Sequence, residues 1–97
     1  MSKEKPGIWI TGASSGIGRA AAIEFAKTGA KVFASGRRSA ELERINTELD
    51  NDKINVEIIP CNVASQTNVD QTVKKILVNS KIDCLINNAG ITSIKLA

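Results

Sequence analysis

Three glycines near the amino terminus have the spacing of a phosphate-binding turn. Gly12, Gly16 and Gly18 follow a short apolar stretch and precede an alanine-rich segment. Glycine carries no Cβ, so it permits a sharp turn at Gly12, the close approach of a phosphate at Gly16 and close packing of the helix on the sheet at Gly18. The first N–H groups of a helix lack intrahelical partners and carry the positive end of its dipole. The turn therefore predicts an anion site that suits a dinucleotide pyrophosphate.

This spacing differs from the common Gly-x-Gly-x-x-Gly fingerprint. Thr11-Gly12-x-x-x-Gly16-x-Gly18 closely resembles the turn of the short-chain dehydrogenase/reductase family. Asn87-Asn88-Ala89-Gly90 resembles the tetrapeptide that ends the fourth strand in that family. The resemblance runs from about Lys5 to Ile94, but it covers only the first half of the family's domain. It implies the cofactor-binding half of an oxidoreductase that acts on a small carbonyl or alcohol substrate.

The resemblance also implies which residues hold the cofactor. Backbone N–H groups of the glycine-rich turn would bind the pyrophosphate, and Ser14 and Ser15 would lie near the adenosine ribose. Asn87 would tie the central strands together through side-chain-to-backbone bonds. The alternatives are an ordinary strand–helix turn with capping serines and a purely structural Asn-Asn turn. The expected cofactor-binding residues are Gly12, Ser14, Ser15, Gly16, Ile17, Gly18, Arg37, Arg38, Asn62, Val63, Asn88, Ala89 and Gly90.

Two adjacent arginines follow the second expected strand. Arg37 and Arg38 come directly after Gly36, and no acidic residue precedes Glu41 in this region. NAD-specific relatives carry an acid there that binds the ribose 2′-hydroxyl, whereas guanidinium groups suit a 2′-phosphate. We therefore expect NADP(H) as the cofactor. The alternative is a solvated basic pair before a helix.

Asn62-Val63 stands where the family usually has Asp-Val, whose acid holds the adenine amino group. Asn62 departs from that pattern, although its side-chain oxygen can still accept a hydrogen bond without a charge. We expect a weaker adenine contact at Asn62. The alternative is that Asn62 only caps a turn.

The catalytic residues of the family have no counterpart in this chain. They are a serine, a tyrosine and a lysine four residues after the tyrosine, and the 97 residues contain no tyrosine and no histidine. Lys95 is too close to the Asn-Asn-Ala-Gly turn to be that lysine. We therefore expect no reductase activity from this chain alone. Residues 1–97 are expected to form one dinucleotide-binding half-domain, a fragment of a longer domain.

Composition argues against several other classes. The net charge of +3 and the three aromatic residues do not favour nucleic-acid binding. No apolar run approaches 18 residues and no secretory leader is evident, so no membrane association is expected. Cys61 and Cys84 are expected as buried free thiols, and no metal site is expected. Free thiols fit a cytoplasmic location, and the full-length protein is expected to be a homo-oligomer.

Strands and helices alternate along the sequence. Strands are expected at Gly7–Thr11, Lys31–Ser35, Ile54–Ile59 and Asp83–Ile86. Helices are expected from about Gly16 to Lys27, from after a Ser39 cap to a break at Asn51-Asp52, and from after Ser65. The last should carry an apolar stripe of Val69, Val73, Ile76 and Leu77. This alternation predicts an α/β fold, and the Rossmann-like order for its parallel sheet is 3-2-1-4, half of a doubly wound domain. The first two helices should share one face of the sheet, with the third opposite.

The sequence is also compatible with two other functions. One is a nucleotide-binding module that binds NADPH and catalyses nothing. The other is a structural or interaction domain, a degenerate remnant that kept the fold and lost the cofactor. A downstream Tyr-x-x-x-Lys would distinguish an enzyme from the first, and tight NADPH binding would exclude the second.

Overall fold

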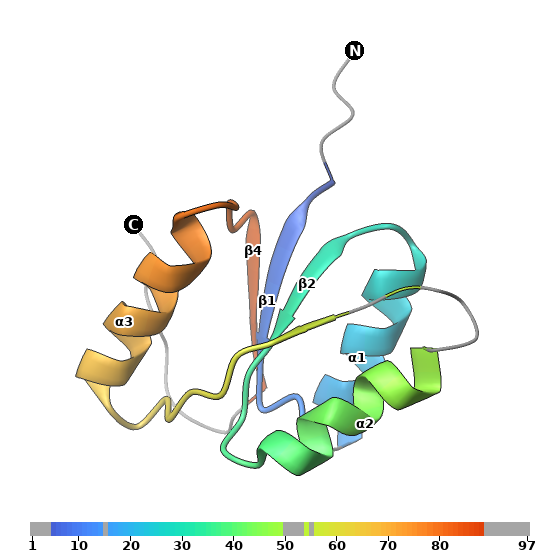
Figure 1. Ribbon diagram of the computed structural model, residues 1–97, viewed down its shortest axis with the longest axis horizontal. Coiled ribbons are helices and arrows are strands. Elements are labelled where there is room, and N and C mark those ends of the chain that lie inside the picture. Colours follow the sequence, from blue (N-terminus) through green and yellow to red (C-terminus); the bar gives the residue numbers. More distant parts are fainter. Residues whose placement is uncertain (1–4, 15, 50–53, 55, 89–97) are drawn as a thin grey trace.

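The computed structural model describes residues 5–14, 16–49, 54 and 56–88. Its strands are β1 (Gly7–Thr11), β2 (Lys31–Ala34), β3 (Glu57–Ile58) and β4 (Cys84–Asn87), and its helices are α1 (Gly16–Lys27), α2 (Ser39–Leu49) and α3 (Gln66–Leu77). All paired strands run parallel. The sheet order is β3-β2-β1-β4, as the sequence predicted. Figure 1 shows the strands converging at their carboxyl ends, beside the start of α1.

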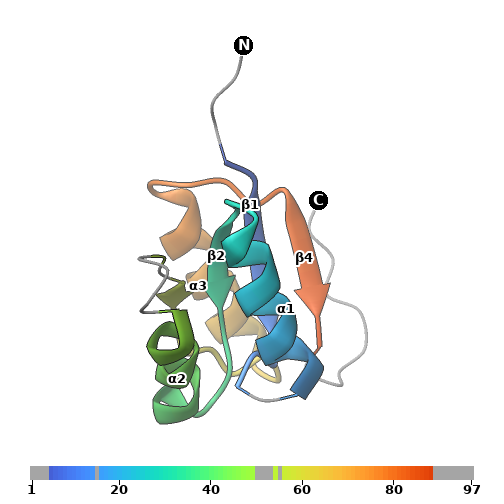
Figure 2. The same ribbon diagram turned by 90° about the vertical axis from the view of Figure 1, so that its right-hand side faces the viewer.

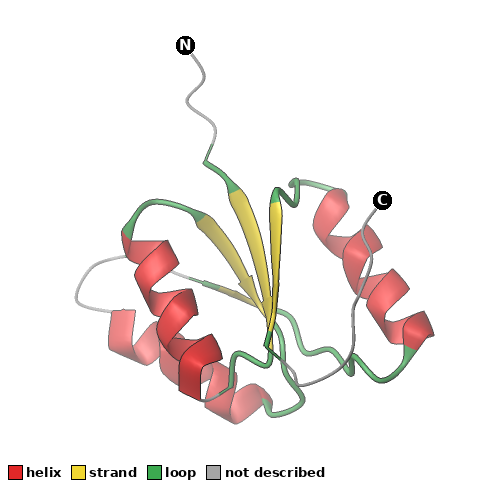
Figure 3. Cartoon of the chain, turned by 180° about the vertical axis from the view of Figure 1, so that it is seen from behind, coloured by secondary structure: helices red, strands yellow, loops and turns green. Residues whose placement is uncertain are grey.

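Helices cover both faces of the sheet. The residues of β1 and β2 alternate between two apolar clusters, because successive side chains of a strand point to opposite faces. Ile8, Ile10 and Val32 pack with buried residues of α1 and α2, whereas Trp9 and Phe33 pack with buried residues of α3. Figures 2 and 3 show α1 and α2 on one face and α3 on the other. The predicted placement of the helices is therefore confirmed.

Strand β3 is shorter than the expected Ile54–Ile59, and residue 55 lies outside the described residues. The N–H of Ile59 still donates to the Ala34 carbonyl at 2.9 Å. Pro60 follows and has no N–H with which to continue the ladder. The residue directly before this strand is bound by a side chain of α2. Asn46 donates to the Val56 carbonyl at 2.9 Å and accepts from the Val56 N–H at 2.7 Å.

The other element limits agree to within a residue. Strand β2 ends at Ala34, α2 begins at Ser39 itself, and β4 is shifted one residue later than expected. Ser65 caps α3, because its side chain accepts from the Asn68 N–H at 3.2 Å.

Two burial predictions are wrong. Cys84 is exposed whereas Cys61 is buried, and Leu77 is 52% exposed although it was expected on the apolar stripe of α3. In the described part of the chain, β4 has a neighbouring strand only on its β1 side, so its first residue has little cover. Leu77 is the last residue of α3, and Val78 directly after it is exposed too.

Candidate functional site

A cavity of about 360 Å³ lies at the carboxyl ends of the strands. Open α/β sheets bind ligands at this edge, where the strand order reverses. The volume is within the range of about 300–1,000 Å³ that is typical of small-molecule sites. Its lining residues are Gly12, Ser14, Gly36, Arg37, Arg38, Cys61, Asn62, Val63, Ala64 and Asn88.

The cavity brings together most of the described residues that the sequence predicted for the cofactor. Gly12, Ser14, Arg37, Arg38, Asn62, Val63 and Asn88 all line it, from three separate segments and the end of β4. Gly16, Ile17 and Gly18 begin α1 and are not among the lining residues. Ser15, Ala89 and Gly90 lie outside the described residues. Ile17 is 79% exposed, so its apolar side chain has no cover in the described part of the chain.

The glycines of the turn serve two different purposes. Gly16 has a φ of 62°, in the left-handed region that side chains disfavour, and a Cβ there would meet nothing within 4 Å. Gly18 is in the helix, and a Cβ there would overlap the Gly12 carbonyl and lie 2.7 Å from Asn88 Nδ2. The close neighbours of Gly18 are therefore the turn and the end of β4, whereas the sequence suggested close contact with the sheet.

Two successive asparagines, Asn87 at the end of β4 and Asn88 directly after it, connect this strand to β1 and to the glycine-rich turn. Asn88 Nδ2 donates to the Gly12 carbonyl at 3.2 Å. Asn87 Oδ1 accepts from the Thr11 hydroxyl at 3.0 Å. This second bond joins β1 to β4 as expected for Asn87, but it runs between side chains. Thr11 was not predicted as a site residue, although its place immediately before Gly12 was the available signal.

Arg37 and Arg38 supply the positive charge of the cavity. Both side chains are exposed. Among the described residues neither arginine forms an ion pair with an acidic side chain. Exposed guanidinium groups on a cavity suit an anionic ligand, because their donors have a planar arrangement.

Asn62 also lines the cavity and closes a turn. Its Oδ1 accepts from the Ala64 N–H at 3.0 Å, and its own N–H donates to Asn68 Oδ1 at 2.6 Å. The turn-capping role is thus present. A carboxamide oxygen has two acceptor positions, so this turn does not exclude a second bond to a ligand.

Sequence reasoning missed Ser35, which is fully buried and directly precedes Gly36, a residue that lines the cavity. Its carbonyl accepts from the N–H of Ala13 in the glycine-rich turn at 3.0 Å. The available signal was a small polar residue at the end of an apolar strand, immediately before Gly36 and the arginine pair.

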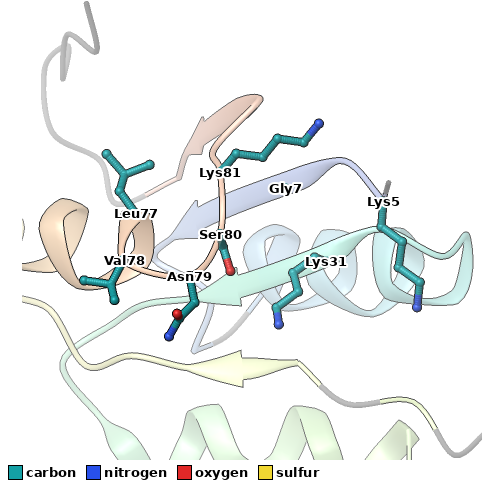
Figure 4. Close-up of a pocket in the computed structure, with 8 residues that line it drawn as sticks. All are labelled: Lys5, Gly7, Lys31, Leu77, Val78, Asn79, Ser80 and Lys81. Carbon is teal, nitrogen blue, oxygen red and sulfur yellow. The ribbon is translucent and has the colours of Figure 1, made fainter. Parts of the chain in front are cut away.

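A second cavity, of about 690 Å³, lies at the amino ends of the strands and is lined in part by Lys5, Lys31 and Lys81. Figure 4 shows that these lysines do not converge, because Lys81 extends to the opposite side from Lys5 and Lys31. It therefore lacks the convergent polar groups of the first cavity. Within the described ranges, no group of three His, Cys, Asp or Glu side chains could hold a metal ion. The described helices are also too short or too polar to cross a membrane.

The family model for short chain dehydrogenases matches residues 7–97. The chain belongs to the short-chain dehydrogenase family. Its members are oxidoreductases that use nicotinamide cofactors, and they act on small molecules. The Rossmann-like fold predicted from the sequence is therefore confirmed by both the topology and the family.

Relatives in sequence and structure agree with this assignment. The 3-oxoacyl-[acyl-carrier-protein] reductase FabG of Rickettsia prowazekii is 42% identical over 88 residues, which are 91% of this chain and 34% of that protein. The citronellol catabolism dehydrogenase AtuB of Pseudomonas aeruginosa PAO1 superposes with a TM-score of 0.81 and 36% identity, over 92% of this chain and 38% of that one. A short-chain dehydrogenase from Shigella flexneri, complexed with NADP, gives a TM-score of 0.80 and 30% identity over 89% and 38% of the two chains.

The chain spans only about a quarter to a third of the length of its curated relatives, with shares of 26%, 35% and 34% for three of them. The matched part contains the glycine-rich turn and the cavity at the strand ends.

Proposed function

We propose that this chain is the NADP(H)-binding half-domain, residues 1–97, of a reductase or dehydrogenase that acts on a carbonyl or alcohol. The observation that carries the proposal is the position of Arg37 and Arg38. They lie at the end of β2 on the 360 Å³ cavity, without ion pairs to described acidic residues. The Shigella flexneri relative, solved with NADP, supports this cofactor. The Rickettsia prowazekii relative, named as a 3-oxoacyl reductase, supports a carbonyl substrate.

The described residues fit such a cofactor. The open space over Gly16 leaves room for a phosphate beside the first N–H groups of α1, where an anion is favoured. Ser14, on the turn, and Asn88, after β4, would lie along the ribose. Arg37 and Arg38 would bind the 2′-phosphate, and Asn62 would accept from the adenine amino group.

A bound nicotinamide would supply the hydride, and a group outside these 97 residues would supply the proton. The family's tyrosine has no counterpart here, because the sequence contains none. This chain therefore binds and orients the cofactor and does not carry the proton. We further propose a cytoplasmic, homo-oligomeric parent protein.

The test compares two fragments of the cofactor by calorimetry on the full-length protein. Adenosine 2′,5′-bisphosphate carries the 2′-phosphate and adenosine 5′-monophosphate does not. The ratio of their affinities therefore measures the contribution of the 2′-phosphate to binding. A charge-assisted bond contributes about 1.5–3 kcal/mol, so the bisphosphate should bind at least about tenfold more tightly. Equal affinities would overturn the preference for NADP(H) and leave NAD(H) as the cofactor. Binding of neither fragment would contradict a cofactor site.

A further inference from the structure

Ser35 makes hydrogen bonds to three different segments although its side chain is fully buried. Its N–H donates to the Ile10 carbonyl at 2.9 Å, and its carbonyl accepts from the Ala13 N–H at 3.0 Å. Its hydroxyl accepts from Trp9 Nε1 at 2.9 Å and donates to the Ile59 carbonyl at 2.6 Å. A hydroxyl can do both at once, so this one is satisfied as a donor and as an acceptor.

The chain of bonds from Trp9 through Ser35 to Ile59 crosses the sheet from β1, past the end of β2, to the segment after β3. Trp9 is also fully buried. A buried polar network in which every member is paired holds its segments in one arrangement, because any other arrangement would leave a polar group without a partner.

Each of the three segments that meet at Ser35 continues into a wall of the cavity. Gly12–Ser14 contains Ala13, which donates to Ser35. Gly36–Arg38 follows Ser35 directly. Cys61–Val63 comes shortly after Ile59, and the Cys61 N–H donates to the Gly36 carbonyl at 3.1 Å. The hydroxyl of Ser35 therefore lies at the common origin of the three walls.

We propose that Ser35 is a positioning residue for the 2′-phosphate of the cofactor. Its hydroxyl, held between Trp9 and Ile59, fixes the backbone from which Arg37 and Arg38 leave the sheet. The inference rests on the proposed function, because it assigns Ser35 to the same cavity and the same ligand. Ser35 does not touch the ligand and acts through the two arginines.

The experiment measures the affinities of adenosine 2′,5′-bisphosphate and adenosine 5′-monophosphate in the full-length protein and in Ser35→Ala, well below the unfolding temperature of both. Ser35→Ala should weaken the bisphosphate about three- to tenfold, since small displacements of binding groups are costly. The monophosphate, which lacks the 2′-phosphate, should change less. Asn46→Ala is the matched control, because the Asn46 side chain also makes two hydrogen bonds, both to the Val56 backbone, and does not line the cavity.

A double-mutant cycle separates positioning from general destabilisation. When Arg37 and Arg38 are both replaced by alanine, Ser35→Ala should cause no further loss of bisphosphate affinity. An equal loss in both backgrounds would show that Ser35 does not act through the arginines, and would overturn the inference. An equal loss in Asn46→Ala would also overturn it, because the effect would then follow from stability alone.

The failures of this inference and of the proposed function are distinguishable. If the unmodified protein does not discriminate between the two nucleotides, both fall. If it discriminates and Ser35→Ala discriminates equally well, only the role of Ser35 is overturned. If Ser35→Ala does not fold, Trp9→Phe removes the indole donor and leaves the bond to Ile59. It should reduce the discrimination about two- to threefold, and unchanged discrimination in this variant would overturn the inference.

Discussion

The hydroxyl of Thr11 donates to Asn87 Oδ1 at 3.0 Å, across 76 residues of sequence. The same two residues are partners in the parallel register of β1 and β4. Each begins a motif that continues toward the cavity, the glycine-rich turn after Thr11 and the tetrapeptide that starts at Asn87. The bond therefore links the two motifs at the point where the chain reverses its strand order.

Thr11→Val should destabilise the protein by about 1–3 kcal/mol. The substitution keeps the shape of a fully buried side chain but leaves Asn87 Oδ1 without this donor. The measurement is urea-induced unfolding. Thr47→Val is the control, because Thr47 is exposed and its hydroxyl bond to the Glu43 carbonyl is long, at 3.4 Å. Similar losses for the two variants would contradict a special contribution from Thr11.

Gly18→Ala should lower the free energy of unfolding more than Gly16→Ala does, although both glycines belong to one motif. At Gly18 the added methyl group would overlap the Gly12 carbonyl, so the start of α1 must shift, which costs about 1–3 kcal/mol or more. At Gly16 the methyl group has space, and the cost is the left-handed conformation, about 1–2 kcal/mol.

Gly16→Asn separates the two causes, since asparagine tolerates that conformation better than alanine does. In thermal unfolding, the midpoint temperature should be highest for Gly16→Asn, lower for Gly16→Ala and lowest for Gly18→Ala. The reverse order for Gly16→Ala and Gly18→Ala would show that backbone strain, and not the contact between α1 and the turn, is the stronger constraint.

Local pattern was sufficient to predict the fold. The apolar residues of β1 and β2 face both ways, which requires cover on both faces, and the alternating helices provide it. The prediction failed at Cys84 because Leu85 and Ile86 beside it indicate a buried strand. Burial of the first residue depends on what lies next to β4, and no pattern within the strand encodes that.

Some residues around the site were also predictable from local pattern, whereas others were not. Gly12, Gly16 and the arginine pair were predictable because each has a local requirement, a left-handed backbone or a charge at a strand end. Ser35 and Asn46 were not predicted, because their importance comes from partners 10 to 26 residues away. In the sequence, a serine and an asparagine of this kind do not differ from ordinary surface residues.

Asn46→Asp should destabilise the protein at neutral pH by about 1–3 kcal/mol. The carboxylate still accepts from the Val56 N–H but no longer donates to the Val56 carbonyl. The neutral carboxyl can donate, so folding favours that form and raises the pKa of the introduced group above its unfolded value of about 3.9. The stabilising bond is thus present below about pH 4 and lost as the pH rises through the folded pKa.

Urea unfolding at pH 7 and pH 4 checks this effect. The quantity compared is the difference in the free energy of unfolding between the variant and the unmodified protein. The difference should be smaller at pH 4. Asn46→Ala is the control, since it has no titratable group and its difference should not follow this pattern. A difference for Asn46→Asp that is the same at both pH values would show that the amide donor contributes little to the contact between α2 and β3.

Arg37→Ala should weaken NADPH binding about ten- to a hundredfold and leave NADH binding unchanged. Arg37 lines the cavity and, within the described part of the chain, has no acidic partner, so its charge is available to a 2′-phosphate that only NADPH carries. Fluorescence titration of the full-length protein with each cofactor gives both affinities. Added salt should weaken NADPH binding more in the unmodified protein than in the variant, because screening acts on the charge that the variant lacks.

Arg44→Ala is the matched control for this prediction. It removes the same charge from the exposed side of α2, where Arg44 pairs with Glu41 at 3.3 Å and does not line the cavity. Its NADPH affinity should stay that of the unmodified protein, because a solvent-exposed charge away from the ligand is largely screened. If Arg37→Ala weakened both cofactors equally, Arg37 would contact a part of the cofactor that NADH shares, and the charge at the end of β2 would not select NADPH.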